Sequence, residues 1–369
     1  MSKEIVAILC SGVALGVYIP ALIVNRRLQL QDVSTEIFVL ENLLQYDKRN
    51  KIPKSKIAFH RSFAVALTGQ KIAKNITPHF DTSIVSEIIS TWKKNALTKF
   101  IVFSGYWIPI LEDYKRQSDL TDISFQICHL DADISVSFKP YKPDKFCFKQ
   151  VYFFSWEEKK ISFFLKINNN NIVPFLSRNE RFVIHGGGWG MGTYKDKIEL
   201  LGEKKISLDV ICYEYNDIKN RIENNRYFMI DPDWKPWEKN NNGNYSFPPF
   251  GTVKDNDTIE FDINDDFSEV YTLISQSRAI ISKPGGATLL DSFSSATPVI
   301  LLEPFGEYEN KNALLWKHLG FGISWQEWMD SGFSITLLEK LHNNLLIARD
   351  NIKDYVEWYY ATSNINKNR

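Results

Sequence analysis

The stretch RAIISKPGGATLLDSFSSATPVILLEPFGEYENKNALLWKHLGFG, residues 278–322, decides the fold. It contains an apolar β-branched run at 279–281, a glycine turn, an amphipathic helix pattern, a second apolar run at 299–302, an acidic loop and another helix pattern. This order predicts two βα units in tandem. Strands that alternate with helices are typical of a parallel α/β sheet.

The turn after the first of these strands has the features of a nucleotide-binding site. Gly285 and Gly286 let a ligand approach the backbone, and Thr288 falls in the first turn of a helix whose free N–H groups suit phosphate. Lys283 can neutralise a phosphate, and Asp291 is placed to accept hydrogen bonds from a ribose diol. A glycine pair alone is ordinary punctuation between a strand and a helix, but this ordered set favours a nucleotide site.

A second glycine turn lies in the same half of the chain. The sequence FVIHGGGWGMGTYKDKIELL, residues 182–201, joins a strand pattern to a helix pattern that begins near Thr193. Glycines leave backbone N–H groups unobstructed, which suits oxyanions, although a dinucleotide-binding fold uses such a turn as well. The candidate ligand-binding glycines of this turn are Gly187, Gly188, Gly190 and Gly192.

Together these residues resemble a known family. The string KPGGAT, followed by Asp291 and the GEYENKNA loop, is similar to the C-terminal donor domain of GT-B glycosyltransferases. The nearest likeness is to the group of the peptidoglycan UDP-GlcNAc transferase and the diacylglycerol glycosyltransferases. The GGG-x-GMG turn agrees with it, so the resemblance covers much of residues 181–325. It implies that the first segment holds the diphosphate and ribose of a UDP-sugar.

The resemblance also assigns positions that the residues alone do not. Phe261 begins the segment whose backbone reads the uracil edge in the family. The loop that contacts the sugar contributes Glu307, Glu309 and Asn310, and it is about one residue longer than the commonest lipid-type pattern. Asp291 stands where the family usually has glutamate, so a shorter arm must reach the ribose.

Transfer to an acceptor needs a group that takes the proton of the acceptor hydroxyl. In the family, the first glycine turn often ends in a histidine with this role, but this chain has Val17 there. Asp131 follows a predicted strand, and ligands of α/β proteins bind where parallel strands end. The candidate catalytic residues are therefore Asp131, His129 and His60. Glu112 and Asp113 are further possible bases, and His185 is placed to contact the donor.

Composition limits the class of protein. A chain of 369 residues suits two domains, and 44 basic against 44 acidic residues give no field that attracts nucleic acid. No carboxylate pair typical of a metal site accompanies the donor motifs, because Asp131-Ala132-Asp133 lies in the acceptor half. We therefore expect no nucleic-acid partner, no metal and no cofactor besides the UDP-sugar. The cysteines are isolated, as in reduced cytoplasmic proteins: Cys10, Cys128, Cys147 and Cys212.

Two segments bear on membranes. Residues 5–24 carry no charge, yet Ser11, Gly12 and Pro20 interrupt them, so we expect a buried strand, a turn and a helix rather than a span. Residues 48–61 are basic, which permits attachment to a membrane surface but also fits a solvated loop. The prediction is a cytoplasmic protein, with peripheral contact at the inner membrane face left open.

The fold class predicted is α/β of the GT-B type, with two Rossmann-like domains facing across a cleft and a C-terminal helix that returns to the first. We divide the chain into an acceptor domain at 1–172, a donor domain at 173–333 and the returning helix at 334–369. Two apolar runs within 149–166 predict a hairpin added to the first domain. The loop 232–249 is either a lid or surface packing. Strands are predicted at 5–9, 36–40, 100–103, 124–127, 181–184, 208–213, 227–230, 279–281 and 299–302.

The function expected from the resemblance is inverting, metal-independent transfer of a sugar from a UDP-sugar to a hydroxyl of a small-molecule or lipid-like acceptor. Two alternatives stay open. A GT-B epimerase acting on UDP-GlcNAc uses the same donor and no acceptor. A catalytically silent nucleotide-sugar-binding partner protein is suggested by Val17 in place of the usual base.

Overall fold

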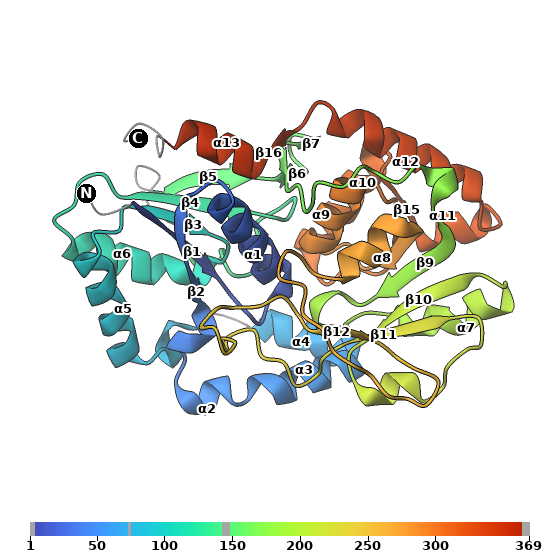
Figure 1. The fold of residues 1–369 in the computed structure, drawn as a ribbon, viewed down its shortest axis with the longest axis horizontal. Helices are drawn as coiled ribbons and strands as arrows, with labels where there is room; N and C mark the ends of the chain where they lie inside the picture. Colours follow the sequence, from blue (N-terminus) through green and yellow to red (C-terminus); the bar gives the residue numbers. More distant parts are fainter. Residues whose placement is uncertain (1–3, 73–74, 142–147, 364–369) are drawn as a thin grey trace.

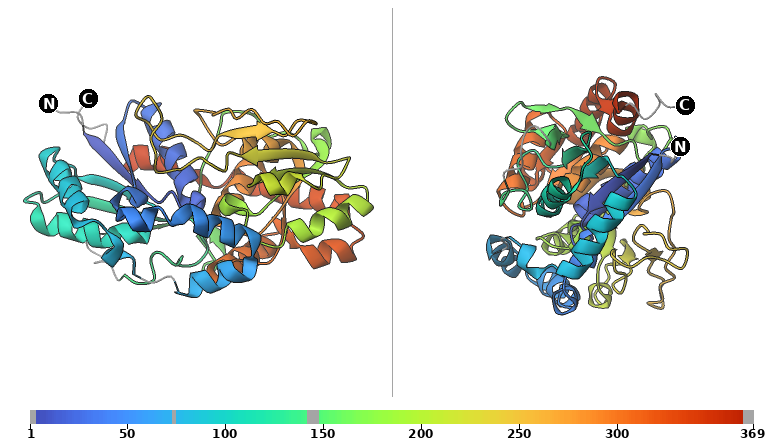
Figure 2. Two further views of the ribbon diagram at one scale, coloured as in Figure 1. Left: turned by 90° about the horizontal axis from the view of Figure 1, so that it is seen from below. Right: turned by 90° about the vertical axis from the view of Figure 1, so that its left-hand side faces the viewer.

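The computed structural model describes residues 4–72, 75–141 and 148–363. Two α/β lobes lie side by side, each built on its own sheet (Figure 1). Every strand predicted from the sequence is present, with bounds that shift by at most a few residues. The view from below in Figure 2 shows helices from the first half of the chain crossing the junction between the lobes.

The first lobe contains a five-stranded parallel sheet in the order β2-β1-β3-β4-β5. Alternate residues of β1 face opposite ways: Val6 and Ile8 pack with α1, and Ala7 and Leu9 pack with α5 and α6. Helices therefore cover both faces, which explains the continuous apolar pattern. The strands are β1 (Ile5–Cys10), β2 (Ser34–Val39), β3 (Lys99–Val102), β4 (Ser124–His129) and β5 (Phe148–Tyr152). The helices are α1 (Leu15–Gln29), α2 (Tyr46–Arg49), α3 (Ile52–Arg61), α4 (Phe63–Ile72), α5 (Thr82–Lys94) and α6 (Ile108–Gln117).

The hairpin predicted within 149–166 is only partly correct. Its first run forms β5, which pairs in parallel with β4 and so belongs to the main sheet. The antiparallel hairpin that does form is short and consists of β6 (Phe154–Ser155) and β7 (Lys160–Ile161). The pattern was misread because a buried edge strand and a hairpin strand share the same apolar run.

The second lobe contains a seven-stranded sheet in the order β12-β11-β10-β9-β13-β14-β15, parallel except for β12. The strands are β9 (Asn179–His185), β10 (Ser207–Cys212), β11 (Arg226–Ile230), β12 (Phe250–Thr252), β13 (Ser277–Ser282), β14 (Val299–Leu301) and β15 (Gly322–Ser324). The helices are α7 (Lys195–Glu203), α8 (Val270–Gln276), α9 (Gly286–Ser295), α10 (Glu307–His318) and α11 (Trp325–Asp330). The tandem βα units predicted at 278–322 are β13-α9 and β14-α10.

The C-terminal segment consists of two helices, α12 (Ile335–Arg349) and α13 (Tyr355–Thr362), separated by β16 (Lys353–Asp354). β16 pairs with β8 (Phe163–Phe164), where the chain leaves the first lobe. Buried His342 of α12 donates to Ala296 O in the second lobe (2.7 Å). The hydroxyl of Tyr355 donates to Gln126 Oε1 in the first-lobe sheet (2.6 Å). The chain therefore returns to the first lobe, as the fold class predicted.

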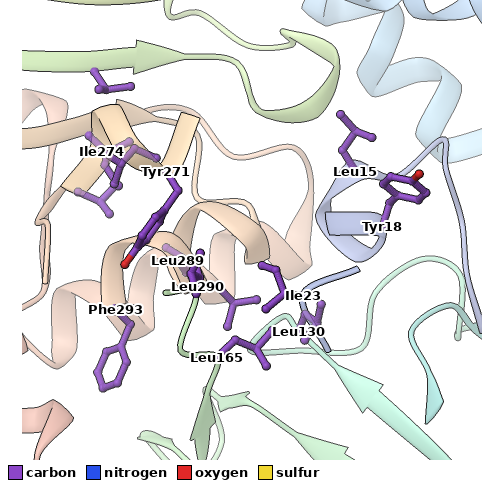
Figure 3. Close-up of a cluster of buried hydrophobic side chains, with 14 of the residues drawn as sticks. Leu15, Tyr18, Ile23, Leu130, Leu165, Tyr271, Ile274, Leu289, Leu290 and Phe293 are labelled. Carbon is purple, nitrogen blue, oxygen red and sulfur yellow. The ribbon is translucent and has the colours of Figure 1, made fainter. Parts of the chain in front are cut away.

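Of the two apolar core clusters among the described residues, the larger runs through both lobes. Figure 3 shows Ile23 of α1 and Leu165 beside Leu290 of α9. Leu130, at the end of the first-lobe sheet, belongs to the same cluster. Burial of apolar surface is the main favourable term in folding. This shared core therefore stabilises the packing of the first lobe against the second.

For the basic residues 48–61 the sequence left surface attachment and a solvated loop open, but they lie largely in α2 and α3. α3 and the following α4 reach the second lobe (Figure 2). The side chain of Gln70 on α4 donates to Phe305 O beyond β14 (2.8 Å). The loop 232–249 also crosses between the lobes, since the Tyr18 hydroxyl of α1 donates to Ser246 O (3.0 Å). One segment of the first lobe thus contacts the second lobe, and one segment of the second lobe contacts the first.

No helix among residues 4–72, 75–141 and 148–363 combines the length and apolar character needed to cross a membrane. The uncharged run at 5–24 forms β1 and part of α1, as the sequence predicted. Cys10, Cys128 and Cys212 are buried, unpaired thiols, and Cys147 lies outside the described residues.

Candidate functional site

The two glycine turns of the second lobe meet at the edge of its sheet. They follow β9 and β13, which are adjacent parallel strands with His185 paired to Ser282 at their ends. The carboxyl ends of neighbouring parallel strands form the usual ligand crevice of an open α/β sheet. Sequence reasoning placed both turns in one site, and the strand order brings them together. Gly192 lies beside the Lys283 side chain, and Gly188 packs against Leu15 of the first lobe.

Lys283 occupies the space between the two turns. Its side chain is close to both Gly187 and Gly285, since a Cβ added at either glycine would lie 3.3 Å from Lys283 atoms. Buried Lys283 forms an ion pair with buried Glu309, whose second oxygen accepts from Phe305 N (2.6 Å). Lys283 is thus already paired, and Glu309, a predicted sugar contact, is instead a buried partner that positions the lysine.

His185 lies behind this pair. Its Nδ1 accepts from Gly187 N (3.0 Å), and burial, helped by the charge of Lys283, lowers its pKa to about 3. The ring is therefore neutral at physiological pH and holds the glycine turn.

The N-terminus of α9 receives a carboxylate from the other lobe. Asp131 follows β4, and Gly286 N donates to its side chain. A Cβ added at Gly286 would lie 2.5 Å from Leu130 O and 2.9 Å from Asp131 Oδ1, so only glycine allows this close approach. Thr288, one turn into α9, is buried beneath it. The helix N-terminus, which favours negative charge, is the point where the two lobes meet.

Burial raises the pKa of the Asp131 carboxyl to about 7, and the charge of Glu309 adds to the rise. Hydrogen bonds from Asn312 and Gly286 and the charge of Lys283 oppose it. A carboxylate has about four lone-pair positions, so these two donors leave room for a further proton donor. Asp131 therefore has the protonation range of a general base at neutral pH.

Asn312 was missed by the sequence reasoning. Fully buried in α10, its Nδ2 donates to Asp131 Oδ1 (2.8 Å) and to Pro284 O (2.8 Å), and its Oδ1 accepts from Ala132 N (2.6 Å). One side chain thus fixes Asp131 against the turn that begins α9. The local signal was present, because Asn312 lies two residues after Asn310 in the quoted GEYENKNA string.

Asp291 lies one turn along α9 and is partly buried. Among the described residues its side chain has no hydrogen-bond donor, while its backbone oxygen accepts from Ser295 Oγ (2.6 Å). Burial raises the pKa of this carboxyl to about 8. A half-buried acid without a partner is unfavourable in the empty protein and is expected where a ligand supplies the missing donors.

The remaining predicted donor contacts differ in exposure. Glu307 is exposed at the start of α10 and lies 3.7 Å from Lys311, and Asn310 is partly exposed on the same turn. Phe261 packs against the core, and the next residue, Asp262, exchanges both backbone hydrogen bonds with Phe250 (2.9 and 3.0 Å). The Asp262 peptide groups are therefore already occupied.

His129 is held by residues other than Asp131. Its ring stacks on Tyr152 with centroids 4.4 Å apart, and its Nε2 bonds Gln150 Oε1 (2.7 Å). Burial lowers its pKa, and its Nδ1 has no partner among the described residues. Residue spacing suggested a histidine–carboxylate pair, but β4 ends at His129, and Asp131 lies in the loop beyond it, where Asn312 holds the carboxyl. The structure gives His129 a packing role on the first-lobe sheet.

His60 links the lobes. Its Nδ1 donates to Gly190 O (2.8 Å), and its Nε2 lies 3.0 Å from Asp217 and 2.8 Å from Lys195 Nζ. Burial alone would raise the pKa of Asp217, but hydrogen bonds from His60 and Lys195 lower it to about 2. His60, Glu214 and Asp217 are close enough to hold a metal, yet the Lys195 ammonium already supplies a cation there. Both His60 nitrogens are engaged, which favours a positioning role over proton transfer.

We expect His60→Ala to lower the free energy of unfolding by about 1–3 kcal/mol, because Gly190 O loses its donor and a buried ring is removed. Urea unfolding followed by tryptophan fluorescence measures the change. Arg61→Ala is the matched control, since exposed Arg61 forms a surface ion pair with Glu214 and should cost under about 1 kcal/mol. Equal stability of the His60 variant and the wild type would contradict the positioning role.

The whole chain superposes on solved glycosyltransferases at low sequence identity. MurG of Acinetobacter baumannii matches with 12% identity and a TM-score of 0.52, covering 99% of each chain. SnogD of Streptomyces nogalater matches with 11% identity and a TM-score of 0.53, covering 98% of this chain and 99% of that one. VinC, solved with dTDP, matches with 10% identity and a TM-score of 0.52, covering 99% and 100%.

No protein-family model matches the sequence, and a search of curated proteins gives no match. At identities near a tenth, the structural likeness establishes the arrangement of the elements along the full length of the chain. With its two α/β lobes, its C-terminal segment that returns to the first lobe and its match to these structures over the full length, this chain has the GT-B fold.

Proposed function

We propose that the protein is a glycosyltransferase that moves a sugar from a UDP-sugar to a hydroxyl of a small-molecule or lipid-like acceptor. The observation that carries this proposal is Asp291, a partner-less, half-buried carboxyl on the helix that begins at the convergent glycine turns. A nucleotide with its diphosphate at those turns would bring its ribose diol to this carboxyl. The fold and the quoted motifs agree with such a donor.

The proposed reaction is a single displacement with inversion, without a metal ion. The acceptor oxygen forms a bond to the anomeric carbon of the sugar as the bond from that carbon to the diphosphate breaks, and the diphosphate leaves with the electron pair. Asp131 accepts the hydroxyl proton. A diphosphate bound at α9 would take the Gly286 N–H from Asp131 and so free the carboxylate at that moment.

Nucleotide preference tests the donor half directly. Isothermal titration with UDP, 2′-deoxy-UDP, dTDP and GDP should give UDP the highest affinity, about tenfold or more above 2′-deoxy-UDP, because the carboxylate loses one donor with the 2′-hydroxyl. VinC was solved with dTDP, so dTDP is the informative competitor. Equal or tighter binding of dTDP would contradict the proposed contact between Asp291 and the ribose diol.

The two alternatives are separated by turnover. Incubation with UDP-GlcNAc alone distinguishes an epimerase, which forms an epimer without acceptor. A silent partner protein binds UDP but neither hydrolyses nor transfers the sugar with any acceptor offered. Release of UDP that depends on an added hydroxyl acceptor is the result expected for a transferase.

A further inference from the structure

The glycine turn of the first lobe is already occupied by a side chain of the protein itself. It lies between β1 and α1, at a strand end where free N–H groups would otherwise suit an anion. The Glu41 carboxylate accepts from Ser11 Oγ (2.6 Å), Gly12 N (2.6 Å) and Val13 N (3.0 Å). These contacts use the donors that a bound phosphate would need.

Glu41 is held there firmly. It follows β2 directly, in the short 3-10 helix Leu40–Leu43, and is 2% exposed. Its partners at the turn are all donors, so the geometry fits an ionised carboxylate. Burial raises the pKa of this carboxyl, while the hydrogen bonds from Ser11, Val13 and Gly12 oppose the rise. Removing all of these donors would leave a buried charge unpaired, which is costly.

The loop from the second lobe covers the same turn. A Cβ added at Gly12 would lie 2.8 Å from Pro236 Cβ and 3.3 Å from Glu41 Oε2. Tyr245 in this loop accepts from Asn42 Nδ2 (2.9 Å), next to Glu41. Glu41 therefore occupies the hydrogen-bond donors of the turn, and the loop 232–249 covers the turn from the second lobe. By contrast, Asp131 at α9 is partly exposed.

We propose that Glu41 is a specificity-determining residue that closes the first-lobe turn to anions. The acceptor is then a hydroxyl compound held without a phosphate or carboxylate group at this turn. The inference rests on the proposed function, because only a transferase has an acceptor. An anionic headgroup at the turn would have to displace a buried, triply hydrogen-bonded carboxylate and would meet its charge.

Backbone amides report the two turns separately. Perdeuterated protein labelled with 15N-glycine is titrated with inorganic pyrophosphate, and the Gly12, Gly285 and Gly286 resonances are followed by TROSY NMR. In the wild type, Gly285 and Gly286 should shift while Gly12 does not. In Glu41→Ala, Gly12 should shift as well. Glu41→Gln, which keeps the size and removes the charge, repeats the test if the alanine variant does not fold.

Each outcome decides one claim. A saturable shift of Gly12 in the wild type overturns the closed turn. An unchanged Gly12 in a folded Glu41 variant overturns Glu41 as its cause and assigns closure to the covering loop. Unshifted Gly285 and Gly286 count against the donor site, and therefore against the proposed function, without touching the prediction for Gly12.

Discussion

Asp131→Asn is expected to lower kcat by about 100- to 10,000-fold, the range for loss of a general base. The amide keeps the hydrogen bond geometry with Asn312 but cannot accept the proton of the acceptor hydroxyl. UDP affinity should not fall and is expected to rise, because the diphosphate no longer competes with a carboxylate for the Gly286 N–H. Steady-state transfer and UDP titration on the same preparation measure the two effects.

The pH profile adds an independent readout. The pKa of Asp131 is about 7, so the wild-type kcat/KM should rise as pH increases through 7 and then level off, because only the deprotonated acid is a base. The asparagine variant should lack this rise. Asp133→Asn is the matched control, since Asp133 lies two residues on and, among the described residues, its side chain accepts only from Ile134 N (2.7 Å). A normal rate in the Asp131 variant would contradict its role as the general base.

Asp291→Asn is expected to weaken UDP binding by about 1.5–3 kcal/mol, or roughly 10- to 100-fold, the value of hydrogen bonds to a charged group. The difference between UDP and 2′-deoxy-UDP should shrink toward zero in the variant. Calorimetry with both nucleotides on both proteins forms a double-mutant cycle that isolates the contact with the 2′-hydroxyl. An unchanged UDP affinity would falsify the ribose role.

The same substitution should stabilise the empty protein. The folded-state pKa of Asp291 is about 8, whereas an unfolded aspartate titrates near 3.9. The folded state then binds more protons than the unfolded state between these values, so this group makes stability fall as pH rises from about 4 through 8. Asp291→Asn should therefore melt higher than wild type at pH 8 and equal it near pH 4. Exposed Asp330→Asn on α11 is the control and should show neither effect.

The donor half was more accessible to sequence reasoning than the acceptor half. The apolar runs of β13 and β14 and the glycines between them are short-range features, and local periodicity reports them directly. The helices α2 to α4 were missed because their burial depends on the second lobe, which no local pattern records. His60 was a candidate by residue type and His129 by its place after a predicted strand, and no local pattern indicated that their ring nitrogens would bond Gly190 O and Gln150 Oε1.

By itself, the sequence determined the alternation of strands and helices, the two glycine turns and the acid on α9, since each depends on residues a few positions apart. Only the tertiary structure decided what those residues touch. Lys283 pairs with Glu309 across 26 positions, and Asp131 with Asn312 across 181. Hydrogen bonds and charges act over a few ångströms in space, so the sheet order and the packing of the lobes, rather than the spacing along the chain, set these partners.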